Sequence, residues 1–154
     1  IEDIGGVIGI QPDKAVVIVG CGRIGQALMN YHEFTKEGIR IVAGFDSNPE
    51  RQDINAAIPI MPMGRMAEIV RAHRIEIGII AVPETSATQV FDDMIQAGIK
   101  GFLNFTAAEL KCHGRCIRPE CPNPCVISSV NIGLELENLF YLVGSRKDLV
   151  QPAP

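Results

Sequence analysis

No apolar run in these 154 residues approaches the ~20 that a membrane-spanning helix needs, and no signal-peptide pattern opens the chain. Positive charge is also scarce, because 14 lysines and arginines stand against 18 aspartates and glutamates, for a net charge of −4. Phosphate contacts need clustered lysine and arginine, so this balance argues against nucleic-acid binding by this segment alone. These absences predict a cytoplasmic protein without a membrane span.

The length and the apolar content of the chain fit one globular domain. Apolar residues make up 47% of the chain, which excludes a disordered or low-complexity protein, and the length suffices to bury a core. The chain opens at Ile1 rather than at a methionine. We therefore expect a piece of a longer protein, in which residues 1–12 form a linker from an upstream region.

Apolar runs alternate with segments of helical periodicity. Strands are predicted at 15–19, 41–45, 58–60, 77–82, 101–103 and 126–130. Helices are predicted at 24–36, 63–74, 85–97 (capped by Thr85 or Ser86 and closed by Gly98) and 134–143. This alternation predicts an α/β fold: a Rossmann-like, doubly wound, mainly parallel sheet over residues 13–130, followed by a C-terminal helix within 131–150.

A glycine-rich turn joins the first predicted strand to the first predicted helix. Its six residues, Gly20-Cys21-Gly22-Arg23-Ile24-Gly25, match G-x-G-x-x-G. In this pattern the first glycine permits a tight turn, the second lets a pyrophosphate approach, and the third lets helix and strand pack closely. Asp46 follows the second strand, where a carboxylate accepts hydrogen bonds from a ribose and repels a 2′-phosphate. The turn thus predicts an NAD(H) site; the alternative is a packing turn without a ligand.

Cys21 lies inside this turn, at the start of a helix. The helix terminus can lower the pKa of a thiol there. The favoured interpretation is that Cys21 has no chemical role and is simply a small residue, tolerated where the backbone of the turn must pass.

Four cysteines form a cluster near the C-terminus. They are Cys112, Cys116, Cys121 and Cys125, in the pattern C-x3-C-x4-C-x3-C. Four thiolates suit a tetrahedral zinc ion or an iron–sulfur cluster, and disulfides or unligated thiols remain a third possibility. Beside a nicotinamide, such a centre would supply a second redox input.

Several segments resemble the nucleotide-binding half of the Rex family, redox-sensing transcriptional repressors of bacteria. They are VVIVGCGRIGQAL (16–28), IVAGFDSNPE (41–50), AVPETSATQVFDDMIQAGIKGFLNF (81–105) and NIGLELENLFYLV (131–143). The most specific element is AGIKGFLNF at 97–105, together with the terminal helix rich in leucine and glutamate. The resemblance covers about residues 7–145, apart from the cysteine-rich stretch.

The resemblance implies a homodimeric repressor that NADH releases from operator DNA. An upstream winged-helix domain, absent from this chain, would bind the operator. It implies that the turn Gly20–Gly25 holds the pyrophosphate and Asp46 the adenosine ribose. Further residues follow from the same resemblance: Val82 and Pro83 along the cofactor, and Asn104, Phe105 and Thr106 near the nicotinamide. The C-terminal helix would be swapped onto the partner through Leu134, Leu136, Leu139, Phe140, Tyr141, Leu142 and Val143, which form more than one apolar face. The alternative is that this helix packs on its own sheet.

Three features depart from the Rex pattern. Met61 stands where the family commonly has a tyrosine, and Asn131 replaces the acidic partner of that tyrosine. Residues 112–125 form an insertion in place of a short loop. Losing both ends of one interaction predicts a different coupling between nucleotide and dimer geometry.

Two other classes of function compete with the sensor. An NAD-dependent redox enzyme is disfavoured, because 154 residues leave little room for a substrate domain and no histidine or lysine follows a strand end in a catalytic position. A nucleotide- or CoA-binding module of a redox complex has the same architecture, but Asp46 and the glycine spacing favour a dinucleotide. We therefore predict a regulatory domain rather than an enzyme.

Overall fold

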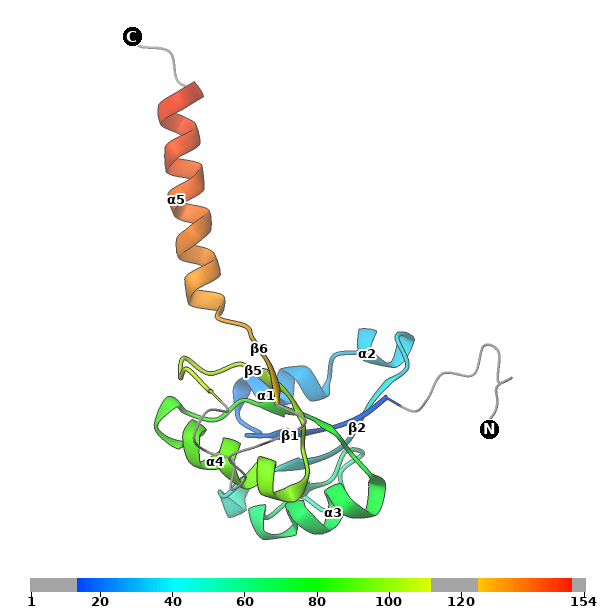
Figure 1. Ribbon diagram of the computed structural model, residues 1–154. Helices are drawn as coiled ribbons and strands as arrows, with labels where there is room; N and C mark the ends of the chain where they lie inside the picture. The colour runs from blue at the N-terminus through cyan, green and yellow to red at the C-terminus, as the bar shows by residue number, and fades with distance from the viewer. Residues whose placement is uncertain (1–13, 112–124, 151–154) are drawn as a thin grey trace, which may run out of the picture.

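The computed structural model describes residues 14–111 and 125–150, with side chains up to residue 145. Six parallel strands form one sheet in the order β3-β2-β1-β4-β5-β6 (Figure 1). The strands are β1 (Lys14–Val19), β2 (Ile39–Phe45), β3 (Ile60–Met61), β4 (Ile77–Ile80), β5 (Gly101–Asn104) and β6 (Val126–Ser129). This is the strand order of a doubly wound dinucleotide-binding fold, so the predicted Rossmann-like sheet is confirmed.

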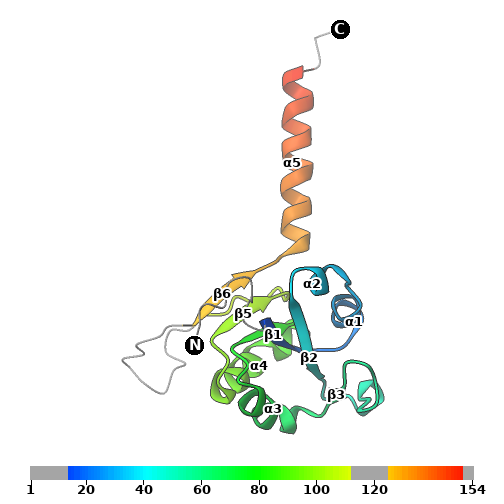
Figure 2. The ribbon, with the colours of Figure 1, turned by 90° about the vertical axis from the view of Figure 1, so that its right-hand side faces the viewer.

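Helices cover both faces of the sheet (Figure 2). They are α1 (Arg23–Met29), α2 (Glu33–Lys36), α3 (Met66–His73), α4 (Glu84–Ala97) and α5 (Ile132–Val150), with short 3-10 helices η1 (Pro49–Arg51) and η2 (Met63–Arg65). Because successive strand residues point to opposite faces, Val17 and Val19 face the α3–α4 side, whereas Val16 and Ile18 face the α1–α2 side. The larger core lies on the α3–α4 side, where the rings of Phe91 and Phe102 meet edge to face at 4.6 Å.

Three local predictions were wrong. The single helix expected over 24–36 is two helices, because the chain turns at Asn30, where the Asn30 N–H donates to the Gln26 carbonyl and the Tyr31 N–H donates to the Leu28 carbonyl. Helix α4 begins at Glu84 after Pro83, rather than being capped by Thr85 or Ser86. Proline suits the start of a helix, since its fixed φ and missing N–H cost nothing there.

The third strand is Ile60–Met61 rather than 58–60. Pro59 has no N–H to give to the ladder, although its carbonyl accepts the Gly44 N–H at 2.9 Å. Gly38 and Gly98 end their helices with φ of +78° and +114°, as glycine allows.

Helix α5 projects away from the sheet (Figures 1 and 2). Its apolar side chains are exposed, including Phe140 at 76% and Tyr141 at 73%. The alternative in which this helix packs on its own sheet is therefore wrong. Among the residues described, no helix combines the length and apolar character that crossing a membrane requires.

Candidate functional site

The site lies at the carboxyl end of β1, where the order of the strands reverses. Val19 of β1 pairs with Phe45 of β2 on one side and with Ile80 of β4 on the other. The chain leaving β1 therefore enters the crevice between the ends of β2 and β4. In open α/β sheets this crevice is where ligands bind.

Two glycines of the turn are required by close backbone packing. Gly20 has φ of +98°, and a Cβ there would collide with the carbonyl group of Ala81. A Cβ on Gly25 would collide with the carbonyl oxygen of Gly20. Both contacts involve main-chain atoms, so neither can relax by a side-chain rotation. These glycines hold α1 tightly against the end of β1.

Gly22 differs from the other two glycines. Its φ is −77°, an ordinary value, and the three atoms nearest to a Cβ there all belong to the guanidinium of Arg51, at 3.7 to 3.9 Å. The fold therefore does not need a glycine at this position. An open face above Gly22 is what close approach of a pyrophosphate requires.

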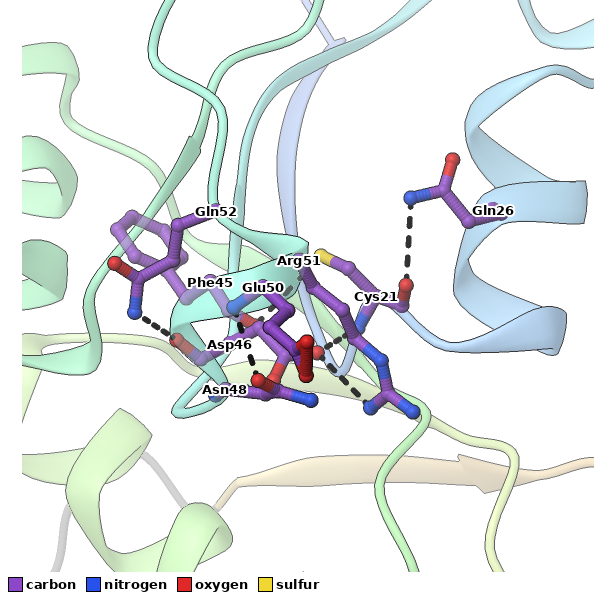
Figure 3. A network of polar contacts seen from close by, with 8 residues as sticks. All are labelled: Cys21, Gln26, Phe45, Asp46, Asn48, Glu50, Arg51 and Gln52. Carbon is purple, nitrogen blue, oxygen red and sulfur yellow. Dashed lines mark hydrogen bonds and ion pairs between the residues drawn. The ribbon is translucent and has the colours of Figure 1, made fainter.

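Asp46 is buried at the end of β2 and held by backbone donors (Figure 3). Its Oδ2 accepts the Cys21 N–H at 2.8 Å, and its Oδ1 accepts the Asn48 N–H at 2.8 Å. The Arg51 guanidinium lies 3.5 Å from Oδ2. The carboxylate thus joins the glycine turn to the loop after β2 and fixes the distance between them.

Cys21 is a buried thiol, in line with the favoured interpretation of a small packing residue, and the alternative of a lowered pKa is wrong. Burial, with the nearby Asp46 carboxylate as the second cause, raises the pKa of Cys21 to about 11. Its Sγ lies 3.7 Å from the Phe45 carbonyl and packs over Gly44, where an added Cβ would be 2.7 Å from the sulfur. The Phe45 carbonyl and the Arg51 guanidinium lower the pKa of this thiol, but by less than burial and Asp46 raise it.

A cavity of about 640 Å³ brings most of the predicted site together. Its lining includes the predicted residues Gly20, Gly22, Arg23, Ile24, Asp46, Val82 and Pro83. A second cavity of about 680 Å³ lies next to it and is lined in part by Cys21, Gly22, Arg23 and Arg51. Both volumes are in the range of small-molecule sites.

The sequence analysis missed Arg51, Asn48 and Ser86, which also line the main cavity. Asn48-Pro49 was a usable signal, because this pair favours a turn that would carry the next side chains back over Asp46. Ser86, in the first turn of α4, faces the cavity instead of capping the helix.

Asn104, Phe105 and Thr106 line neither of these two cavities as the described residues form them. Asn104 is 1% exposed, and its Oδ1 accepts both the N–H and the hydroxyl of Thr106, at 2.9 and 2.7 Å. Its Nδ2 donates to the Ala108 carbonyl at 2.9 Å. This network fixes the turn after β5, beside the end of β4.

The cysteine cluster lies almost wholly outside the described residues. Cys112, Cys116 and Cys121 belong to the part of the chain not described, and Cys125 is half-buried against the core just before β6. Within 14–111 and 125–150, no three histidine, cysteine or acidic side chains gather as metal ligands would.

The two positions that depart from the Rex pattern have local roles. Met61 is buried in β3, and its carbonyl accepts the Asp46 N–H at 3.1 Å. Asn131 precedes α5, and its Oδ1 accepts the Leu134 N–H at 3.0 Å, as a helix cap does.

Comparison with known proteins agrees with this geometry. The family model described as CoA binding domain matches residues 11–108. The chain belongs to the CoA binding domain family. A Redox-sensing transcriptional repressor Rex from Clostridium perfringens is 34% identical over 143 residues, which cover 92% of this chain and 63% of that protein. The Rex of Lactobacillus gasseri is 37% identical over 134 residues, covering 86% of this chain and 58% of that protein.

Solved Rex structures share the fold. RSP in complex with beta-NADH has a TM-score of 0.73 at 25% identity, covering 88% of this chain and 61% of that chain. RSP in complex with beta-NAD+ and operator DNA has a TM-score of 0.76 at 24% identity, covering 94% and 63%. These relatives confirm the resemblance to Rex, and they are named as repressors rather than as enzymes. The chain spans less than two thirds of their length.

Proposed function

We propose that this chain is the NADH- and NAD⁺-sensing domain of a cytoplasmic redox-responsive repressor that leaves its operator when NADH binds. The observation that carries the proposal is the junction at the strand-order switch point. There the open face of Gly22, the backbone-held Asp46 and the Val82-Pro83 segment line one cavity. The Rex relatives, whose solved structures include NADH and NAD⁺ complexes, support the choice of ligand.

Each part of the junction fits one part of a dinucleotide. The N–H groups at the start of α1 and the flat surface of Gly22 suit the pyrophosphate. Oδ1 of Asp46, which accepts the Asn48 N–H, keeps a further lone pair that suits an adenosine ribose hydroxyl. Val82 and Pro83 provide an apolar wall toward the nicotinamide. The bound nicotinamide would carry the redox state, and the protein would supply only binding and orientation.

Anaerobic calorimetry with NADH and NAD⁺ tests the proposal, with Gly22→Val as the decisive variant. Because Gly22 has an ordinary φ and no close main-chain neighbour, valine there leaves the fold intact but fills the space of the pyrophosphate. We expect tighter binding of NADH than of NAD⁺ to the unaltered chain, and loss of both in the variant. Gly64→Ala, at a position where nothing lies within 4 Å of the added carbon, is the control.

Equal affinities for NADH and NAD⁺, or an unaltered NADH affinity in Gly22→Val, would contradict the proposal. CoA belongs in the same titration, because the matched family takes its name from it. The adenosine of CoA carries a 3′-phosphate, which the buried Asp46 carboxylate disfavours. Tighter binding of CoA than of NADH would make the chain a CoA-binding module instead.

Homodimerisation through α5 and operator binding through an upstream winged-helix domain complete the proposal. Exposed apolar side chains on α5 support the first, and the net charge of −4 agrees with DNA contacts lying elsewhere. Since Met61 is buried and Asn131 caps α5, we propose that nucleotide binding reaches α5 without a tyrosine–carboxylate pair.

We also propose that Cys112, Cys116, Cys121 and Cys125 hold a zinc ion or an iron–sulfur cluster. Four thiolates are a donor set suited to either centre. Metal analysis and the visible spectrum of anaerobically prepared protein distinguish them, because only the cluster absorbs visible light. Serine at both Cys116 and Cys121 should remove the metal, whereas serine at Cys21 should not; retention of the metal in the double variant would refute the site.

A further inference from the structure

The main cavity extends past Asp46 to three side chains that the proposed function does not use. They are Met63, in the first position of η2, and Val90 and Asp93 of α4. We call them the base subsite. Met63 follows β3, which lies beyond β2 at the edge of the sheet, so the base subsite lies on the side of Asp46 away from the nicotinamide end. A ribose held by Asp46 would carry its base into this part of the cavity.

Two members of the base subsite are apolar and belong to the larger core. Val90 is 8% exposed, and Met63 packs against the same core cluster. Their elements meet there, because η2 leads directly into α3, and α3 and α4 cover the same face of the sheet (Figures 1 and 2). Such apolar walls suit a flat heteroaromatic ring, but they do not distinguish one base from another.

Asp93 adds a polar group to these walls. Its side chain is half-buried, and its Oδ1 accepts the Gln89 Nε2–H at 2.9 Å, one turn earlier on α4. Its Oδ2 receives no hydrogen bond from the residues that the structure describes. Phe91 and Met94, on either side of Asp93 in the sequence, are completely buried and anchor this part of α4 in the core. The carboxylate is therefore carried by a rigid helix, with one oxygen available to a ligand.

A carboxylate distinguishes bases by what they present at one edge. It only accepts hydrogen bonds, because it has no proton of its own when ionised. Adenine presents an exocyclic amino group, which is a donor, whereas guanine and hypoxanthine present a carbonyl oxygen at the same position. The carboxylate would bond to the amino group and repel the carbonyl oxygen.

We propose that Asp93 recognises the amino group of adenine through Oδ2 and so makes the site selective for adenine dinucleotides. This inference rests on the proposed function, because it concerns the same dinucleotide site. The matched probe is reduced nicotinamide hypoxanthine dinucleotide, in which a carbonyl oxygen replaces that amino group and the rest of NADH is kept. We expect NADH to bind at least about ten-fold more tightly than this probe, since the lost hydrogen bond is to a charged acceptor.

The test is a set of anaerobic titrations of the full chain with the two dinucleotides, on the unaltered protein and on Asp93→Asn. Asparagine has the size of aspartate, but its amide can also donate to the carbonyl oxygen of hypoxanthine. We expect the preference for NADH to shrink from about ten-fold to less than about three-fold. Glu84→Gln is the control: it removes the same charge from the same helix, at a residue that does not line the cavity, and should leave the preference unchanged.

The outcomes separate this inference from the proposed function. If the unaltered chain binds NADH and the hypoxanthine probe equally, the role of Asp93 is wrong and the NADH site stands. An unchanged preference in Asp93→Asn would also overturn the inference, because another group would then recognise the base. Equal weakening of both dinucleotides in that variant would mark Asp93 as a purely structural residue. If the unaltered chain binds neither dinucleotide, both the proposed function and this inference fail.

Discussion

The sheet domain and α5 contain similar apolar residues, but the sheet domain buries them whereas α5 exposes them. Phe45 and Phe91 of the sheet domain are completely buried, whereas Phe140 on α5 is 76% exposed. The difference is the covering surface: β2 and α4 meet neighbouring elements of their own chain, and α5 projects beyond them (Figure 1). The sheet domain is therefore self-sufficient in packing, and α5 is not.

This contrast extends to polar groups. Both carboxylate oxygens of Asp46 and the side-chain amide of Asn104 find partners within the same domain. On α5, exposed apolar side chains face water on more than one side, an arrangement that does not stabilise an isolated helix. A second copy of this chain is the simplest partner that could cover these side chains, and this is the dimer proposed above.

The largest effect on stability should come from a substitution at Gly25, in the sheet domain. The added methyl group of Gly25→Ala collides with the main-chain oxygen of Gly20, so the contact between α1 and β1 must open. We expect the free energy of unfolding to fall by about 4 kcal/mol. Urea denaturation measures it, and Gly64→Ala, in open space, should leave it almost unchanged. A loss below that of an ordinary surface substitution would mean that this turn is not tightly packed.

The next effect concerns α5 and should spare the fold of the sheet domain. The double variant Leu139→Glu/Phe140→Glu places charge where we propose that the partner covers the helix. We expect dimer affinity to fall at least a hundred-fold, equivalent to about 3 kcal/mol, as measured by sedimentation equilibrium. Glu137→Gln on the same helix serves as the control. Unchanged sedimentation of the double variant would show that these side chains cover no partner.

A smaller effect is expected at the polar junction of the sheet domain. In Asp46→Asn, the amide offers one acceptor oxygen in place of two, so either the Cys21 or the Asn48 N–H loses its partner. We expect a loss of about 2 kcal/mol in the free energy of unfolding. Thermal unfolding measures this loss. Ser47→Ala, on the same loop, is the comparison, and equal stabilities of the two variants would contradict the bridging role of Asp46.

The smallest effect depends on pH and on Cys21. Its thiol has a pKa of about 11 in the folded chain against an ordinary value of 9.0, so the unfolded chain loses this proton first as pH rises. The contribution of this thiol to the free energy of unfolding is present in full below pH 9 and is lost between pH 9 and 11. The loss is about 1.4 kcal/mol at pH 10. Cys21→Ala should unfold with a correspondingly flatter pH dependence over this window. Parallel curves for the two proteins would show that the folded thiol is not shielded.

Much of the fold followed from local patterns. Unbroken apolar runs gave five strands close to their observed bounds, and the Gly98 stop of α4 was placed correctly. The errors came where tertiary contacts or proline decided, as at the start of α4 and in the short β3. The glycine turn and Asp46 were predictable because their spacing reflects the length of one strand-helix-strand unit. Arg51 was not, because its importance arises from where a three-residue turn directs one side chain.

The sequence by itself determined the alternation of strands and helices, the glycine turn, the acid after β2 and the apolar character of the last helix. These depend on periodicity and on residue types that act within a few positions. Only the tertiary structure decided that Cys21 is a shielded thiol, that Arg51 lies 3.5 Å from Asp46, and that α5 projects beyond its own sheet. Those properties depend on contacts between segments far apart in the chain, whose distances and burial no local pattern fixes.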